Sequence, residues 1–428
     1  MNTRSNQPAQ QRRQLHDLKG LPRSAALSQL RQAAEAASPP NYPPEAFFAP
    51  AALWNWIRTY LSYVFHGKHY FPTYSASPTA AVYELVDERS GDGVRVSIAG
   101  DWGTGTSEAQ GVARQMEKSQ PHFTIHIGDV YYVGDPPSVN ENCLGIRNPN
   151  NNYDPVRWPL GTVGSFALNG NHEMYANGGG YFDVFLPRLG VRTASGMTGQ
   201  QTSFFCLQNQ YWRVIAVDTG YNSIGVPILS GIPWINSIPG IGGDCELPSA
   251  LMDWLQQVVR PAEDQRGLIL LSHHQNYSGF QDQYAKPAQQ LWDAGVRRRV
   301  LWFWGHEHRL AGYDLNGTGD LKSYGRCVGH GGMPVDLGAP VREPRPSFYD
   351  NRRGANEFGV NGHVNLRFEG PRVHCSYVDL NGNELLEETF QAAGGNVGLV
   401  SQRQVIQDPD FHGPVRVREK DLNRKGRQ

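Results

Sequence analysis

Side chains that can bind metal ions follow five short apolar segments of the sequence. They lie in DWG, GDVYY, GNHE, LLSHH and GHEH. Any one of them has an ordinary structural explanation, because an aspartate after a strand can cap a turn and a histidine there can simply be hydrogen-bonded. Five in one chain favour a metal centre, because oxygen donors and neutral imidazoles together suit iron or a borderline divalent ion. The candidate donors are Asp101, Asp129, Asn171, His273, His306 and His308.

The segments that carry these donors predict parallel strands of an α/β fold. VRVSIAGD and FTIHIGD flank a helix-compatible stretch at residues 107–119, and this order predicts a βαβ unit. Further strands are predicted at SFALNGN, WRVIAVD, GLILLSHH and RVLWFWGHEH, with helices at LPSALMDWLQQVV and PAQQLWDAG. Open α/β sheets place their sites at the carboxyl ends of the strands. The donors should therefore meet at one edge of the sheet.

Changes in pattern divide the chain into three predicted parts. Residues 1–90 are expected to form a tether and helical appendage, with helices at 24–37 and 47–65. Residues 91–395 should form the catalytic domain, which ends in three antiparallel strands at GVNGHVNLRFEG, PRVHCSYVDLNGN and ELLEETF. A charged, mobile tail is predicted at 396–428. The long segments 134–160 and 219–246 are expected to wall the site.

Composition excludes several classes of partner. Lys and Arg total 39 against 40 for Asp and Glu, so the net charge of −1 gives no footprint for nucleic acid. The five cysteines form no CxxC, which argues against a thiolate zinc site and a disulfide framework. The apolar stretch 47–65 contains Pro50, Asn55 and Arg58, so it is not expected to span a membrane. The polar amino terminus lacks a signal sequence, and we expect a cytoplasmic protein, with export open if a leader is missing.

The ordered motifs resemble the signature of the calcineurin-like metallophosphoesterases. The resemblance covers residues 101–308 and implies a dinuclear metal site in a four-layer α/β/β/α sandwich with mixed sheets. The first motif is usually DxH in that superfamily, but the third residue here is Gly103. The purple acid phosphatase branch has DxG, GDxxY, GNHE, VxxH and GHxH, and its tyrosine occupies the coordination site of the missing histidine. Tyr132 lies at that position, and Tyr131 does not.

The resemblance implies a ligand for each coordination position. Asp129 would bridge two ions. The first ion would be bound by Asp101, Asp129, Tyr132 and His308, and the second by Asp129, Asn171, His273 and His306. A phenolate is a hard anionic donor that suits trivalent iron, so we expect Fe(III) with a divalent Fe, Zn or Mn partner.

Three side chains beside the ligands are expected to act on the substrate. His172 should hydrogen-bond the phosphoryl oxygens and protonate the leaving group, and Glu173 should orient its ring. His274 is expected to contact the substrate, since the VxxH frame selects His273 of this pair as the ligand. Two ions can orient a phosphate, neutralise its charge and acidify a bound water. The predicted activity is therefore acid phosphatase-like hydrolysis of a small-molecule phosphoric ester by a metal-bound hydroxide.

Other functions remain open from the sequence. The ligands do not distinguish a monoesterase from a diesterase. A nucleotide or cyclic-nucleotide phosphodiesterase could use two divalent ions without a tyrosinate. A non-catalytic scaffold with the same fold is the alternative outside enzymes, although every expected position of the site is filled.

Overall fold

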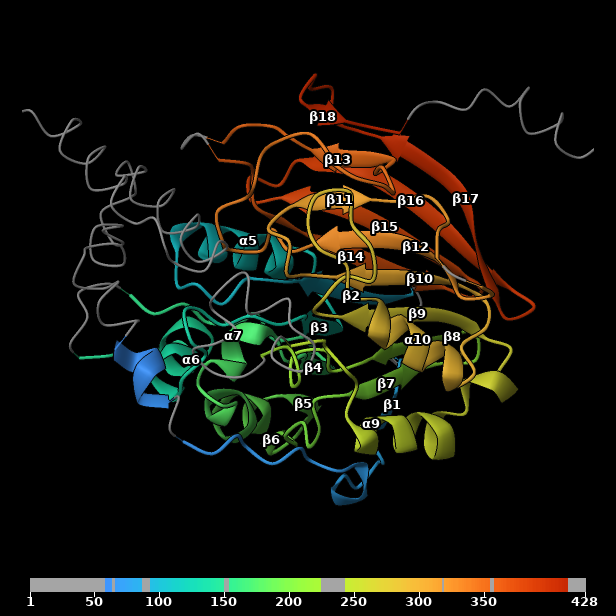
Figure 1. Ribbon diagram of the computed structural model, residues 1–428. Coiled ribbons are helices and arrows are strands. Elements are labelled where there is room, and N and C mark those ends of the chain that lie inside the picture. Colours follow the sequence, from blue (N-terminus) through green and yellow to red (C-terminus); the bar gives the residue numbers. More distant parts are fainter. Residues whose placement is uncertain are drawn as a thin grey trace, which may run out of the picture.

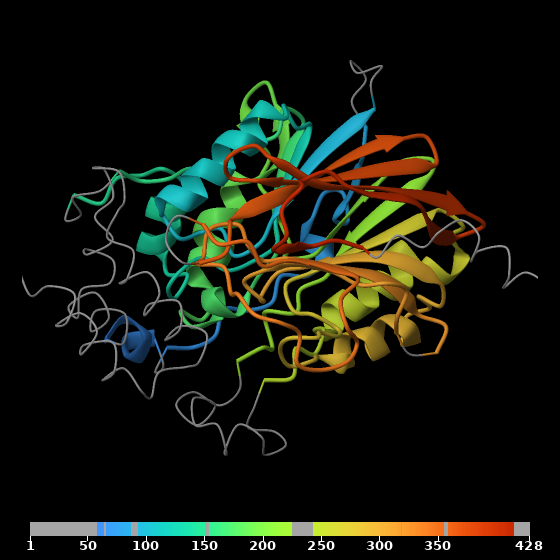
Figure 2. The ribbon, with the colours of Figure 1, turned by 90° about the horizontal axis from the view of Figure 1, so that it is seen from above.

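Two nine-stranded mixed sheets lie face to face and carry helices on their outer sides (Figures 1 and 2). The computed structural model describes residues 58–63, 66–86, 93–149, 154–224, 243–317, 319–354 and 358–414. The predicted helices at 24–37 and, apart from 58–63, at 47–65 lie outside these ranges. In the described part of the chain, no helix is both long and apolar enough to cross a membrane.

The first sheet contains the predicted βαβ unit. Strands β2, β3 and β4 are parallel neighbours, and β14 joins β2 in antiparallel register. Helix α5, Ser107–Lys118, connects β2 to β3, and the Thr106 side chain caps it by accepting the N–H of Ala109. The order is β17-β16-β15-β14-β2-β3-β4-β5-β6. Its strands are β2 (Val94–Ala99), β3 (Phe123–His126), β4 (Gly164–Ala167), β5 (Gly190–Thr193), β6 (Gly196–Met197), β14 (Gly362–Glu369), β15 (Arg372–Asp379), β16 (Glu384–Ala393) and β17 (Asn396–Gln404).

The second sheet has a parallel centre as well. Strands β8, β9, β10 and β12 run parallel, in the order β1-β7-β8-β9-β10-β12-β11-β13-β18. Its strands are β1 (Val82–Glu84), β7 (Phe205–Gln208), β8 (Trp212–Ala216), β9 (Gly267–Ser272), β10 (Arg299–Trp304), β11 (Leu310–Gly312), β12 (Lys322–Val328), β13 (Phe348–Asp350) and β18 (Phe411–His412). The other α-helices of the described residues are α6 (Pro136–Asn142), α7 (Asn171–Met174), α9 (Ser249–Trp254) and α10 (Ala285–Asp293), and the 3-10 and π-helical segments are η1 (Tyr74–Ala76), η2 (Gly180–Phe185), η3 (Leu186–Arg188), η5 (Leu255–Val259) and η6 (Pro261–Glu263).

Three apolar cores separate the four layers, as the α/β/β/α prediction requires. The central core joins inward-facing residues of both sheets, such as Ile98 and Ile269. A second core lies under α9 and α10, and a third lies under α5 and α6. A buried ion pair also crosses the central core: the Arg326 guanidinium on β12 donates two 2.7 Å hydrogen bonds to Glu388 on β16. The predicted sandwich is therefore confirmed.

The first part of the charged tail predicted at 396–428 forms two strands. Residues Asn396–Gln404 form β17, which pairs with β16 through hydrogen bonds along a hairpin. Phe411–His412 then forms β18 at the edge of the other sheet. The polar composition of β17 reflects an edge strand whose residues are mostly half-buried or exposed. The division into an appendage and a catalytic domain stays a prediction.

Candidate metal centre

The predicted donors lie where parallel strands of both sheets end. Asp101 and Asp129 follow β2 and β3, and the pairs His273–His274 and His306–His308 follow β9 and β10. Helix α7 begins at Asn171, after β4. The backbone at Asp101, Asp129 and His306 is left-handed, with φ of 57°, 73° and 65°. Such conformations are costly for residues with a side chain and persist where the surrounding structure fixes them, as functional sites do.

The first group of polar atoms contains two carboxylates, a phenol and an imidazole. The Tyr131 hydroxyl lies 2.8 Å from Asp101 Oδ1, 3.1 Å from Asp129 Oδ2 and 2.9 Å from His308 Nε2. All four side chains are buried. One phenolic hydrogen cannot satisfy both carboxylates, so a cation among these oxygens would relieve the repulsion between them.

The phenol in this group is Tyr131 and not the predicted Tyr132. Val130 forms a parallel bridge with Gly103, and the Tyr131 N–H donates to the Gly103 carbonyl at 2.9 Å. The chain then turns at residues 131–133, and the Tyr131 hydroxyl is directed at Asp101 and Asp129. Tyr132 instead packs, half-buried, against Val133. The sequence-based placement of the phenol is corrected accordingly.

The second group contains Asn171, Asp129 and two imidazoles. Asn171 Oδ1 lies 3.2 Å from His273 Nε2 and 2.9 Å from His306 Nδ1. Asp129 Oδ1 lies 3.3 Å from His273 Nε2. Asp129 therefore faces both groups, one with each carboxylate oxygen. A β-carbon at Gly170 would collide with Asp129, which explains why a glycine precedes Asn171 in GNHE.

Counting protons shows that the second group fits a cation. His273 Nδ1 lies 2.9 Å from the Ile127 carbonyl and must carry the hydrogen. In a neutral ring Nε2 then carries a lone pair, which faces oxygens of Asp129 and Asn171. Burial opposes a charge on His273, but Asp129, Asp101 and Glu173 together outweigh it and raise the pKa of His273 to about 10. The position thus stabilises positive charge, which a metal ion can supply in place of the proton.

The imidazole of His306 is in the form that binds metals. Burial, followed by the charge of His273, lowers the pKa of His306 to about 3, so the ring is neutral at neutral pH. His273, His274 and His306 have ring nitrogens within 4.8 Å of one another. One oxygen each of Asp101 and Asp129 and a nitrogen of His273 also lie within 4.8 Å of one another. The donor set is typical of iron or a borderline divalent ion.

His172 lies beside the first group with one ring nitrogen directed at it. Its Nδ1 donates to the Tyr132 carbonyl at 2.5 Å, and its Nε2 lies 3.8 Å from Asp129 Oδ2. The ring packs against Tyr131 with 4.2 Å between centroids. Burial lowers the pKa of His172, against the opposing effect of Asp129. Nε2 is therefore the nitrogen that can exchange a proton with a bound molecule.

Glu173 does not orient the His172 ring, as the sequence suggested, because its contacts are with the backbone. Its Oε2 accepts the N–H of Gly170 at 2.8 Å and that of Asp129 at 3.2 Å. Burial and then the charge of Asp129 raise the pKa of Glu173 to about 8. The carboxyl thus joins the two loops that carry Asp129 and Asn171.

His274 is held at the second group by a residue outside every motif, Thr219, which begins the segment 219–246 that was expected to wall the site. The Thr219 hydroxyl accepts the backbone N–H of His274 at 3.0 Å and also lies 3.0 Å from its Nδ1. Tyr284 was missed, although its hydroxyl lies 3.5 Å from His306 Nε2. Neither residue belongs to a motif, and both reach the site from loops.

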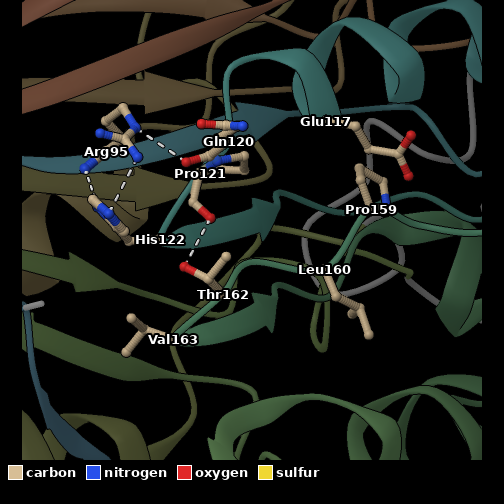
Figure 3. A pocket seen from close by; sticks show the side chains of 9 residues that line it. All are labelled: Arg95, Glu117, Gln120, Pro121, His122, Pro159, Leu160, Thr162 and Val163. Carbon is tan, nitrogen blue, oxygen red and sulfur yellow. Dashed lines mark hydrogen bonds between the residues drawn. The ribbon is translucent and has the colours of Figure 1, made fainter. Parts of the chain in front are cut away.

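A cavity of about 440 Å³ lies at the amino ends of β2 and β3, opposite the ends that carry Asp101 and Asp129 (Figure 3). Arg95 enters it at the start of β2, and His122 precedes β3. The His122 ring accepts the backbone N–H of Arg95 at 2.9 Å. The amino ends of β2 and β3 thus face this cavity, whereas the predicted donors follow their carboxyl ends.

A family profile identifies the family of the chain. The family profile described as calcineurin-like phosphoesterase matches residues 94–310. Curated proteins gave no match. Among solved structures, GAP50, the anchor in the inner membrane complex of Plasmodium, is 14% identical with a TM-score of 0.41, covering 74% of this chain and 90% of that one. A predicted phosphoesterase from Streptococcus pneumoniae is 10% identical with a TM-score of 0.25, covering 73% and 100%. Vps29 from Chaetomium thermophilum is 10% identical with a TM-score of 0.26, covering 74% and 97%.

Proposed function

Because the chain belongs to the calcineurin-like phosphoesterase family, we propose that this metallophosphoesterase hydrolyses small phosphate esters at a dinuclear centre of the purple acid phosphatase type. The observation that carries the proposal is the buried phenol of Tyr131 among Asp101, Asp129 and His308. A β-carbon at Gly103 would lie 3.0 Å from the Cα of Val130, tighter than ordinary packing. Gly103 therefore suits the close bridge that brings Tyr131 inward, and a phenol takes the place of an imidazole.

Each group of donors would hold one ion. The first ion would be bound by Asp101, Asp129, Tyr131 and His308, and the second by Asp129, Asn171, His273 and His306. When bound, two such ions neutralise phosphate charge and lower the pKa of a bound water. Anionic oxygen donors in the first group suit Fe(III), and the imidazoles and amide of the second suit divalent Fe, Zn or Mn.

The protein itself would supply the proton for the leaving group. The Tyr132 carbonyl fixes His172 Nδ1 as the hydrogen-bond donor, so Nε2 is directed toward Asp129 and the donor groups. A proton carried on Nε2 could pass to the departing alcohol oxygen, as general acids do in such reactions. His274, held by Thr219, lies beside the second group and would contact the phosphoryl oxygens.

Metal analysis combined with a substrate screen tests the proposed function. The protein is loaded with iron and a divalent ion, and aryl phosphate monoesters and diesters are compared across pH. Two ions per chain, one of them iron, with hydrolysis of these esters are expected. A protein that is colourless when oxidised, yet fully loaded and active with only Zn or Mn, would contradict the iron assignment and favour a phosphodiesterase with two divalent ions.

Replacing Tyr131 by phenylalanine should remove the phenolate from the iron. We expect Tyr131→Phe to lose the visible phenolate-to-iron absorption of the oxidised protein, because the hydroxyl beside Asp101 and Asp129 is gone. Tyr132→Phe is the matched control, because the Tyr132 ring packs against the cluster of Val133 and Ala176. This substitution should leave the absorption unchanged. Visible spectra of both iron-loaded variants make the comparison. Loss of the band in Tyr132→Phe alone would return the ligand role to Tyr132.

A further inference from the structure

Residues 66–69 contact the loop after α7, and the same loop contacts a short helical turn at 58–63. Asn177 makes the central contacts: its carbonyl accepts the N–H of His69 at 2.9 Å, and its Nδ2 donates to the Tyr63 carbonyl at 2.6 Å. The Tyr221 hydroxyl donates to the His69 carbonyl at 2.6 Å. Residues 58–63 and 66–69 precede every motif in the sequence. They are thereby attached at Asn177, which follows His172 by five positions.

Four tyrosines lie together at this contact. We call them the tyrosine rim, and they surround the buried side chains of Val133 and Ala176. All four are half-buried, so each keeps part of its surface accessible. The rim consists of Tyr60, Tyr63, Tyr132 and Tyr175.

The tyrosine rim contacts His172, the predicted proton donor. The ring of Tyr60 meets the ring of Tyr175 edge to face at 5.6 Å and 84°. The ring of Tyr175 in turn meets His172 at 4.9 Å and 73°. The Asn171 amide lies 3.4 Å from the Tyr175 hydroxyl. An aromatic surface therefore leads from the donor groups to the amino-terminal turn.

The rim is uncharged at neutral pH. A phenol has an ordinary pKa of about 10 and is neutral at pH 7, and burial followed by the charge of Asp135 raises the pKa of Tyr63 further. Neutral phenol rings attract other aromatic rings through edge-to-face contacts. They offer no ionic attraction to a charged group on the alcohol part of the substrate. The alcohol part of the substrate should therefore be aromatic.

We propose that the substrate is a phosphate ester of an aromatic alcohol, whose ring binds the tyrosine rim while its phosphate binds the donor groups. This inference rests on the proposed function. His172 stands between the two binding regions, where the oxygen that joins phosphate and ring would lie. The turn at 58–63 is thus part of the binding site for the leaving group.

Binding of two phosphonates tests the inference without turnover. Calorimetry on the metal-loaded full chain compares phenylphosphonate with methylphosphonate, which share the charged group and differ in the ring. We expect phenylphosphonate to bind more tightly, and Tyr60→Ala to weaken it roughly three- to tenfold, the range of one aromatic contact. Methylphosphonate affinity should not change. Tyr60→Phe should restore phenylphosphonate binding, because it keeps the ring.

Leu61→Ala is the matched control on the same turn, since Leu61 is 45% exposed and lies outside the rim. It should leave both affinities unchanged. Equal affinities of the wild type for the two phosphonates, or equal losses for both in Tyr60→Ala, would overturn the inference and leave the proposed function intact. Failure of the metal-loaded wild type to bind either phosphonate would overturn both.

Discussion

Asp129→Ala is expected to abolish metal binding and hydrolysis together. Asp129 faces both donor groups, through Oδ2 to Tyr131 and through Oδ1 to His273. Its removal takes a ligand from each ion, and the loss of several kcal/mol of transition-state stabilisation lowers turnover by at least about a thousandfold. Metal content by atomic spectroscopy and turnover of an aryl phosphate are measured on the same preparation.

The control for Asp129→Ala must separate metal loss from unfolding. Asp350→Ala also removes a buried carboxylate, but one that pairs with Arg352 at 2.9 Å, away from the donor groups. It should lower the free energy of unfolding while both ions remain bound. Retention of two ions by a folded Asp129→Ala protein would show that Asp129 does not bridge them. Thermal unfolding of each variant establishes that the comparison is between folded proteins.

The sequence predicted the strands that carry the site because their pattern is local. The last four residues of each of the five strands are buried on both faces, so apolar residues dominate there until the chain reaches the end of the strand. The change from apolar to polar residues marks that end directly. The crossover helix α5 was equally visible, since its four buried residues recur at helical spacing.

Contacts between distant segments set the features that the sequence did not predict correctly. The choice between Tyr131 and Tyr132 depends on the bridge from Val130 to Gly103, 27 residues earlier, and on the turn at residues 131–133 that follows it. A motif spacing counts positions but does not define this direction. Glu173 was misassigned for a related reason, since its partners are backbone N–H groups of two loops. Strand β17 was mistaken for a tail because its order comes from pairing with β16.

His172→Ala should leave both ions bound and lower turnover of alkyl phosphates by roughly 10²- to 10⁴-fold, the usual contribution of a general acid. The hydrogen bond of its Nδ1 is to the Tyr132 carbonyl, and its Nε2 lies 3.8 Å from Asp129, so we expect the ligands to stay in place without the ring. The loss should depend on the leaving group. An alkoxide needs a proton as it departs, whereas a nitrophenolate does not, so nitrophenyl phosphate should be affected least.

Leaving-group dependence also distinguishes proton donation from a structural effect of the substitution. His363→Ala is the matched control, because His363 is a fully buried histidine on β14 that should affect folding alone. Any loss of activity that it causes should be the same for alkyl and nitrophenyl esters. Equal losses for both esters in His172→Ala would assign His172 to phosphate binding and not to proton transfer. Loss of metal in that variant would instead place its imidazole among the ligands, a role that its Nδ1 contact with the Tyr132 carbonyl disfavours for that nitrogen.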